Sequence, residues 1–223
     1  MKRVLFIGNS YTYYNNLWDI FANICKIEGI NVKVDQVTNG GWSLMQMSNI
    51  NDTFGKEVDR KLKENKYDVV ILQEQSVRPV IEKELFFEAV EVLVNKISKN
   101  GAKTYLYETW GRKTGNIVLE QFNLTNKSMT EKLIESYNEI ANKLNLTVCH
   151  VGTTFYNIFN NYDIELYDED KTHPSYIGSV VAALVIYGTI FNKKTINLSE
   201  KLIDDEITQK ILEKEVSNVL SNE

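Results

Sequence analysis

The chain of 223 residues has little of several residue types that would each point to a class of protein. It contains two prolines, 11 glycines, two cysteines and two histidines, with no low-complexity segment and no repeat of solenoid length. The cysteines and histidines are too few and too scattered to give the spacing of a zinc site. We therefore expect no metal, and Cys25 and Cys149, which fall on apolar positions, are expected to be small buried residues.

Positive charge and long hydrophobic runs are also scarce. The formal net charge is -5 and the isoelectric point is near 5.3, which leaves no basic surface for nucleic acid or for an acidic membrane. The first apolar run ends at Gly8, too short for a signal peptide or a membrane span. We expect a cytoplasmic protein. Because no linker divides the chain, we expect one domain over residues 1–223, with the oligomeric state left open.

Five apolar runs of strand length alternate with segments of helical periodicity. The expected strands cover residues 3–7, 31–37, 67–72, 103–107 and 146–151. The main expected helices cover about residues 14–25, 58–63, 82–99 and 128–144, and Asp52 or Thr53 can cap the second of them. A small-residue helix is expected around residues 178–184. It is followed by a last helix whose apolar stripe is formed by Ile203, Ile207, Ile211 and Leu212. This last helix either docks on the body or meets a partner. This alternation predicts a three-layer α/β/α sandwich around a five-stranded parallel sheet of flavodoxin-like order.

In such a sheet ligands bind beyond the carboxyl ends of the strands. The loops expected there contain Ser10, the pair Gly40 and Gly41, residues 73–75, residues 110–112 and residues 170–173. The connection from Gly111 to Asn126 is long, as lids and binding loops often are.

A serine at the end of a first strand is either a helix cap or a nucleophile. A nucleophilic serine needs a base and a group that orients that base. Asp170 and His173 are three residues apart on a turn before a helix and can form that pair, with Asp168 as the reserve acid. Each residue alone also has an ordinary interpretation: a cap, a loop histidine, a solvated charge. Their joint placement at one sheet edge favours catalysis. His150 falls within the expected fifth strand and is interpreted as structural.

These residues together resemble the SGNH (GDSL-like) hydrolase family, in particular its carbohydrate and acetyl esterases. Gly8-Asn9-Ser10 is similar to the block that carries the nucleophile, with Asn in place of Asp. Gly40-Gly41 is similar to the second block, and residues 170–175 to the block that gives acid and base. The resemblance implies a Ser10–His173–Asp170 triad acting through an acyl-enzyme without a cofactor. It implies an oxyanion hole from the N–H groups of Ser10 and Gly41, helped by the adjacent helix N-terminus.

The third block departs from the family pattern, because residues 73–76 read Gln-Glu-Gln-Ser where an Asn is usual. An amide N–H can still point at the oxyanion, and Gln75 is the first choice for this donor and Gln73 the second. The substrate-binding candidates follow strand ends and are Trp42, Arg78, Trp110 and Arg112. The tryptophan rings would stack on sugars, and the arginine guanidinium groups would bind an anion. The ordinary alternative is that the tryptophans form a hydrophobic lid and the arginines form surface ion pairs.

The function predicted from these residues is a serine esterase for small acyl esters, with acetyl first, on a small molecule or an acylated carbohydrate. Two alternatives stay open. A flavodoxin-like phosphate- or nucleotide-binding module would use the residues after the first strand as an anion cradle. A carbohydrate-binding relative would have lost catalysis through the altered third block.

Overall fold

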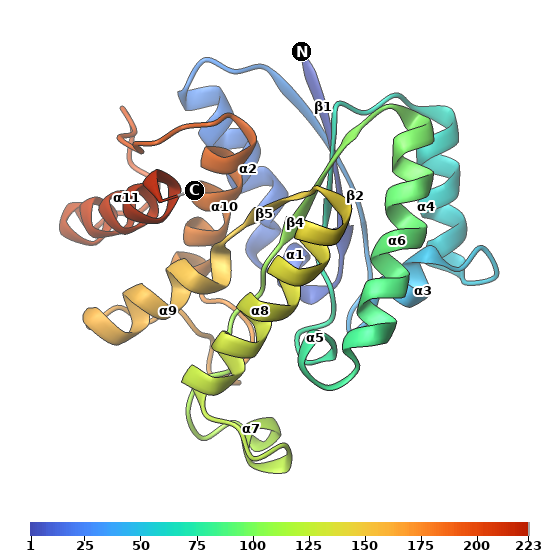
Figure 1. Ribbon diagram of the computed structural model, residues 1–223. Helices are drawn as coiled ribbons and strands as arrows, with labels where there is room; N and C mark the ends of the chain where they lie inside the picture. Colours follow the sequence, from blue (N-terminus) through green and yellow to red (C-terminus); the bar gives the residue numbers. More distant parts are fainter. Residues whose placement is uncertain (223) are drawn as a thin grey trace.

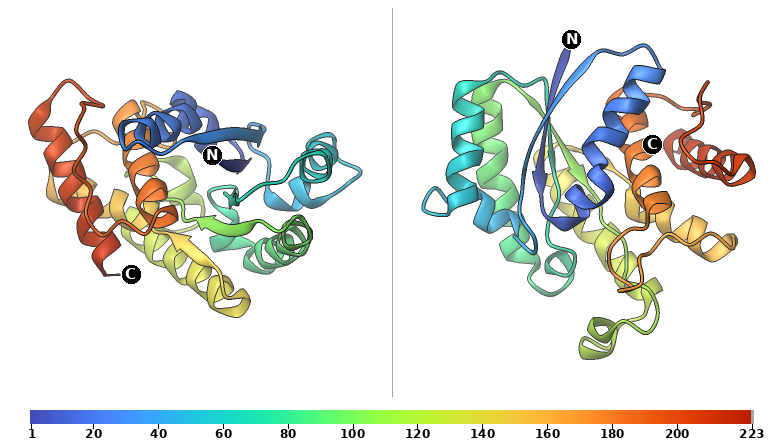
Figure 2. Two further views of the ribbon diagram at one scale, coloured as in Figure 1. Left: turned by 90° about the horizontal axis from the view of Figure 1, so that it is seen from above. Right: turned by 180° about the vertical axis from the view of Figure 1, so that it is seen from behind.

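The computed structural model describes residues 1–222 of the chain. A sheet of parallel strands runs through the centre, with helices on both faces (Figure 1), and the view from above in Figure 2 shows these layers. The spatial order β2-β1-β3-β4-β5 is the flavodoxin-like one, so the predicted fold is confirmed. The strands are β1 (Lys2–Gly8), β2 (Val32–Thr38), β3 (Val69–Leu72), β4 (Lys103–Tyr107) and β5 (Thr147–Cys149).

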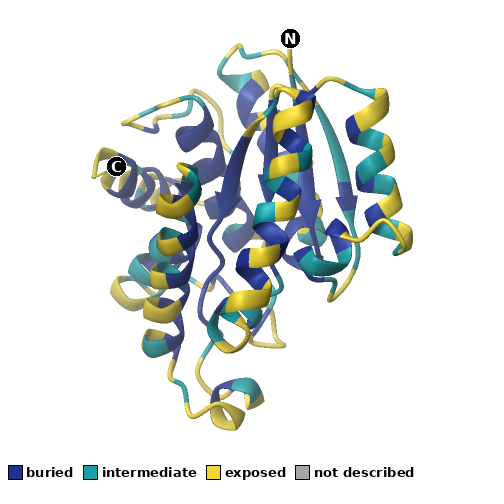
Figure 3. Cartoon of the chain, turned by 45° about the vertical axis from the view of Figure 1, so that its right-hand side comes forward, coloured by how far each residue is buried: buried dark blue, intermediate teal, exposed yellow. Residues whose placement is uncertain are grey.

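Two hydrophobic cores lie on the two sides of the sheet. One core is closed by α2 (Leu17–Ile27), α9 (Val151–Asn161), α10 (Tyr176–Ile190) and α11 (Glu206–Ser221). The other is closed by α3 (Leu44–Ser48), α4 (Thr53–Glu64), α6 (Lys83–Asn100) and α8 (Asn126–Leu144). Figure 3 shows the central strands buried and the outer sides of the helices exposed. Cys25 and Cys149 are fully buried, as expected from their apolar positions.

Strand β1 lies inside the sheet, between β2 and β3, and contributes side chains to both cores. Val4 and Phe6 join the core beneath α2 and α10, whereas Leu5 and Ile7 join the core beneath α4 and α6. Successive side chains of a strand point to opposite faces, so a strand covered on both sides has to be apolar throughout. This requirement explains the uninterrupted apolar run. The residues after Gly8 lie at the carboxyl edge of the sheet, next to the ends of β2 and β3.

Several element boundaries differ from the sequence prediction. The segment after β1 is not one helix: α1 (Ser10–Tyr13) and a 3-10 turn η1 (Tyr14–Asn16) precede α2. The break falls at Asn15 and Asn16, which both have a positive φ, a conformation that asparagine tolerates better than most residues. The long connection before α8 contains α7 (Ile117–Gln121), and α5 (Arg78–Ile81) follows β3.

The last helix docks on the body of the protein, one of the two predicted outcomes. Leu212, Val216 and Leu220 of α11 are buried in the core that α10 also closes. Ile207, which the predicted stripe included, is 72% exposed and lies outside this contact. Within residues 1–222, no helix has both the length and the apolar character needed to cross a membrane.

Candidate active site

Ser10 lies directly beyond strand β1 and is buried, with 9% of its surface exposed. The cap of α1 is Asn9, whose side-chain oxygen accepts the Tyr11 N–H at 3.1 Å. The Asn9 amide also donates to the Trp42 carbonyl at 2.9 Å, a bond that an aspartate carboxylate cannot make. Since Asn9 does the capping, the Ser10 hydroxyl remains for another partner. Helix α1, whose N-terminus lies at Ser10, has only four residues and is shorter than the continuous helix expected there.

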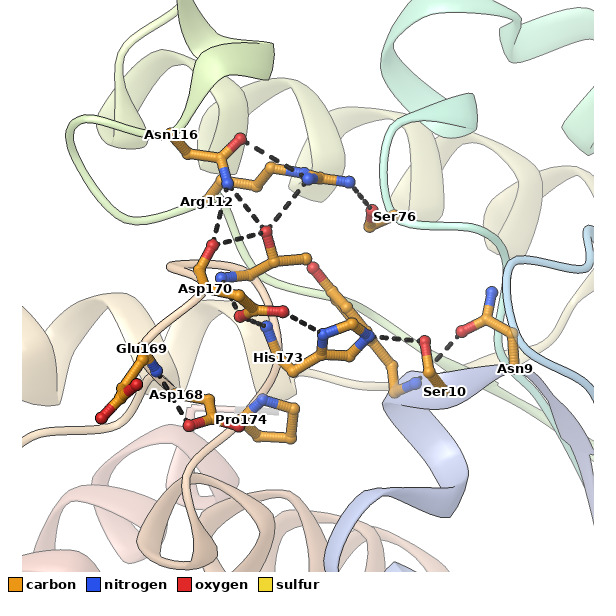
Figure 4. A network of polar contacts seen from close by, with 12 residues as sticks. Asn9, Ser10, Ser76, Arg112, Asn116, Asp168, Glu169, Asp170, His173 and Pro174 are labelled. Carbon is orange, nitrogen blue, oxygen red and sulfur yellow. Dashed lines mark hydrogen bonds and ion pairs between the residues drawn. The ribbon is translucent and has the colours of Figure 1, made fainter.

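The partner of Ser10 is His173, which comes from the loop before α10. His173 Nε2 lies 2.7 Å from Ser10 Oγ, and His173 Nδ1 is hydrogen-bonded to Asp170 Oδ2 (Figure 4). The three side chains therefore form a hydrogen-bonded chain from a carboxylate through an imidazole to a hydroxyl. Asp168, the reserve acid, instead accepts the Glu169 N–H at 2.8 Å.

The turn from Asp170 to His173 holds the carboxylate in place. Asp170 Oδ1 accepts the backbone N–H groups of Thr172 and His173, both at 2.9 Å. Lys171, between Asp170 and Thr172, has a φ of +60°. Partial burial of Asp170 alone would raise the pKa of its carboxyl, but the hydrogen bonds from His173 and from the backbone outweigh it and lower the pKa below the ordinary value. Asp170 is thus held ionised beside the imidazole.

Two residues that hold the histidine were not predicted from the sequence. The Tyr14 ring stacks on the His173 ring, with 4.0 Å between centroids and an interplanar angle of 7°. The Asn15 amide donates to the Pro174 carbonyl at 3.1 Å and to Ser179 Oγ at 2.9 Å. The pair of adjacent asparagines was the sequence signal, because it marks a break in the helix that turns Tyr14 toward the loop.

Gln73, the second choice for an oxyanion donor, does not fill that role. Its side-chain oxygen accepts the Asn9 N–H and the Thr12 hydroxyl, both at 2.9 Å, and its amide nitrogen donates to the Glu74 carbonyl. The residue is 1% exposed, so its donors point into the protein. A Cβ atom on Gly8 would lie 2.5 Å from Gln73 Oε1, which explains the glycine before Asn9. Gln73 therefore ties β3 to the turn after β1.

Gln75, the first choice, lines the pocket beside Ser10 together with Gly41. Its side-chain oxygen accepts the N–H groups of Val77 and Arg78, at 2.9 and 3.1 Å. Only the oxygen of the amide can accept two N–H groups, so these bonds fix which side of the amide carries the NH₂ group. Gly41 has a φ of +73° and lies in the same pocket. As the first residue of α1, Ser10 has an N–H without an intrahelical acceptor.

Glu74, between the two glutamines, is a fully buried carboxyl. Its Oε1 accepts the N–H groups of Leu44 at 3.0 Å and of Gln75 at 2.6 Å, whereas Oε2 has no partner among the described residues. Burial raises the pKa of this carboxyl to about 7, and the two backbone hydrogen bonds only partly offset that effect. Glu74 joins the start of α3 to the loop that carries Gln75.

The two tryptophans predicted to bind substrate have other contacts, and for Trp110 the prediction is wrong. Trp110 is 1% exposed and is stacked between Tyr11 and Phe155, with centroid distances of 4.5 and 4.2 Å. Its indole N–H donates to the Thr172 carbonyl at 3.2 Å, so it supports the loop of His173 from below. Trp42 is half-buried and turned to Asp52, whose carboxylate accepts its indole N–H at 3.1 Å.

The two predicted arginines lie at the cleft. Arg78 pairs with Glu82 on α5, at 3.0 Å. Arg112 donates to Ser76 Oγ and Thr172 Oγ1, both at 3.0 Å, and to Asn116 Oδ1 at 3.5 Å (Figure 4). Arg112 thereby links β3, β4 and the histidine loop. The second histidine is placed elsewhere: His150 Nδ1 lies 2.8 Å from the buried Glu108, just beyond β5 rather than within it.

A pocket of about 320 Å³ opens over Ser10 and His173. Its walls include Gly41, Gln75 and Arg112, and these three residues also line an adjoining hollow of about 350 Å³ that extends to Arg78. Pockets of this size suit small ligands. A hydroxyl, an imidazole and a carboxylate in line, facing such a pocket, can carry out nucleophilic acyl transfer.

Solved structures with the same fold are similar to this chain over most of its length. A protein from Slackia heliotrinireducens assigned to the SGNH hydrolases is 26% identical, with a TM-score of 0.77, covering 85% of this chain and 98% of that one. A DUF4886 family protein from Bacteroides uniformis is 18% identical, with a TM-score of 0.83 over 98% of this chain and 94% of its own. An acetyl xylan esterase is 16% identical, with a TM-score of 0.62 over 84% of this chain and 99% of its own.

No protein-family model and no curated protein matches the sequence. The chain has a flavodoxin-like α/β fold, in which Ser10, His173 and Asp170 are connected by hydrogen bonds in the order of a Ser-His-Asp triad. The chain shares the fold of solved SGNH, or GDSL-like, hydrolase structures, and the resemblance predicted from the motifs is confirmed.

Proposed function

We propose that this protein is a serine esterase that hydrolyses small acyl esters, acetyl esters first, through a covalent acyl-enzyme. The observation that carries the proposal is the continuous line from Ser10 Oγ to His173 Nε2, at 2.7 Å, and on to Asp170. A serine hydroxyl is a weak nucleophile unless a base takes its proton, and this line supplies the base and the group that orients it.

In the proposed mechanism His173 Nε2 takes the Ser10 proton while Ser10 Oγ attacks the ester carbonyl. Asp170 accepts the Nδ1–H, which selects the tautomer with a free Nε2 and stabilises the imidazolium that forms. His173 then gives the proton to the leaving alcohol. Water enters, and His173 takes a proton from it as the water oxygen attacks the acyl carbonyl. His173 then gives that proton to Ser10 Oγ as the acyl–oxygen bond breaks, which releases the acid and restores Ser10.

Three donors support an oxyanion hole in this proposal: the N–H groups of Ser10 and Gly41 and the amide NH₂ of Gln75. Gln75 fits the part of the missing asparagine because its oxygen is held by two backbone N–H groups, so its NH₂ does not have to be oriented during the reaction. Each such donor is typically worth about 10²- to 10³-fold in rate.

A sugar as the alcohol is supported by the similarity to an acetyl xylan esterase and to an acetyl-xylooligosaccharide esterase. Stacking of a sugar ring on the two tryptophans does not support it, because Trp110 is buried and Trp42 faces Asp52. The small pocket favours a short acyl chain.

The test is the hydrolysis of p-nitrophenyl acetate by the wild type, Ser10→Ala and His173→Ala, with His150→Ala as the control histidine. We expect Ser10→Ala and His173→Ala to lose about 10³-fold or more in kcat/KM. We expect His150→Ala to keep a hydrolytic activity that depends on Ser10 and His173. A fluorophosphonate should label Ser10 in the wild type. Full activity in Ser10→Ala, or loss in His150→Ala with retention in His173→Ala, would contradict the assignment.

A further inference from the structure

The cleft contains one arginine without a carboxylate partner. Of the four arginines in the chain, Arg3, Arg60 and Arg78 each form an ion pair, with Asp35, Glu57 and Glu82. Within residues 1–222, Arg112 bonds only to uncharged groups, namely two hydroxyls and an amide oxygen. It is half-buried and lines both the pocket over Ser10 and the adjoining hollow.

The hydrogen bonds of Arg112 leave part of its guanidinium unsatisfied. A guanidinium has five N–H donors, and three hydrogen bonds to side chains are present. The enclosed Nε has no acceptor among the described residues. Taking a cation partly out of water costs free energy that uncharged acceptors offset less well than an anion does. The fold accepts this cost at the wall of the candidate active site.

The other charged group at the pocket does not neutralise Arg112. The Asp170 carboxylate lines the same pocket, but both of its oxygens are engaged, by the backbone of Thr172 and His173 and by the His173 ring. Arg112 is held by Ser76 and Thr172, which line the same pocket and come from the loop after β3 and the loop before α10. The side chain is therefore fixed in place before any ligand arrives, as a preorganised binding group is.

We propose that Arg112 is an anion subsite, and that the esters this protein hydrolyses carry a carboxylate or a similar anion within reach of Ser10. This proposal rests on the proposed esterase function and narrows its substrate class. The anion sits on the guanidinium while the ester carbonyl meets Ser10 Oγ. Charge-assisted bonds to arginine are directional, so the subsite also orients the ester.

Two matched pairs of esters test the subsite and locate the anion. The pair p-nitrophenyl hydrogen succinate and p-nitrophenyl butyrate differs by a carboxylate in the acyl part. The pair para-acetoxybenzoate and para-acetoxybenzamide differs by a carboxylate in the alcohol part. We expect the wild type to prefer the anionic member of one pair by about 10- to 100-fold in kcat/KM, as for a hydrogen bond to a charged group.

Arg112→Gln should abolish that preference, and Arg60→Gln, which removes an arginine on α4, should keep it. Equal rates within both pairs for the wild type, or an unchanged preference in Arg112→Gln, would overturn the proposal. Should Arg112→Gln fail to fold, the wild type decides through competitive inhibition. Succinate or para-hydroxybenzoate should inhibit at least about 10-fold more tightly than the matching amide, and equal inhibition overturns the subsite.

Calorimetric binding of the same acids and amides to Ser10→Ala separates this proposal from the esterase function. If Ser10→Ala hydrolyses the esters as fast as the wild type, the esterase mechanism is wrong, whereas the preference for acids in binding still measures the subsite. If hydrolysis depends on Ser10 but acids and amides bind alike, the esterase stands and the anion subsite is wrong.

Discussion

Glu74 gives the sharpest prediction for stability, because its buried carboxyl titrates in a pH range in which the folded protein can be studied. One oxygen accepts two backbone N–H groups and the other has no partner among the described residues. Burial raises the pKa of this group from 4.5 to about 7 in the folded protein. The perturbation is Glu74→Gln, which keeps the shape and one acceptor oxygen but removes the titration.

The sign follows from proton binding. Between pH 4.5 and about 7 the folded protein keeps a proton on Glu74 that the unfolded chain has lost. The stabilising contribution is thus complete below the unfolded pKa and is lost as the pH rises through the folded pKa. The difference of about 2.5 pKa units corresponds to about 3 kcal/mol, at about 1.4 kcal/mol per unit.

The assay is urea unfolding at pH 5, 6, 7 and 8 for the wild type, Glu74→Gln and Glu88→Gln, the last being an exposed carboxyl on α6. Taking the difference between variant and wild type cancels the other titrating groups, including both histidines. We expect Glu74→Gln to gain about 2 to 3 kcal/mol relative to the wild type between pH 5 and pH 8, and Glu88→Gln to show no such trend. Parallel pH profiles for the wild type and Glu74→Gln would refute the reasoning.

Three further changes test the site and its support. Gln75→Glu keeps the oxygen that accepts from Val77 and Arg78 but replaces NH₂ by an acceptor, so kcat should fall about 10²- to 10³-fold with little change in unfolding midpoint; unchanged kcat would exclude this donor. Asp170→Asn should lower kcat by about 10³- to 10⁴-fold, because an amide does not stabilise the imidazolium; a fall below tenfold would contradict the role of the acid. Gly152→Ala should cost about 2 to 4 kcal/mol in urea unfolding, since its Cβ would lie 2.1 Å from the Thr109 carbonyl oxygen; an unchanged midpoint would show that α9 can shift freely.

The sheet and its order could be predicted from the sequence because burial on both faces leaves a clear pattern. The apolar run from Val4 to Ile7 has to satisfy two cores, and the run from Val69 to Leu72 does the same. Ser10, His173 and Asp170 followed from that fold, since a parallel sheet brings the loops after its first and last strands to one edge. Loop topology was enough to bring together residues 163 positions apart.

Side-chain direction could not be predicted in the same way. Trp110 follows β4 and has the position of a substrate contact, but stacking between Tyr11 and Phe155 buries it beneath the cleft. Tyr14 was expected on the inner side of a continuous helix, and the break at Asn15 instead turns it onto His173. Both outcomes depend on packing between segments far apart in the chain, which local periodicity does not contain.

The altered third block does not by itself favour a relative without catalysis. The side chains of Gln73 and Glu74 form hydrogen bonds that join loops. Gln75 lines the pocket, so its NH₂ group still offers the block a hydrogen-bond donor for the oxyanion. Around it the fold retains two features that cost stability: a buried carboxyl at Glu74 and an Arg112 guanidinium whose Nε has no acceptor and which has no ion-pair partner among residues 1–222. A protein under no functional demand gains nothing from such groups, and local departures from a stable design concentrate at working sites. Since both lie within the walls and supports of the pocket over Ser10, they favour a site that binds and turns over an ester.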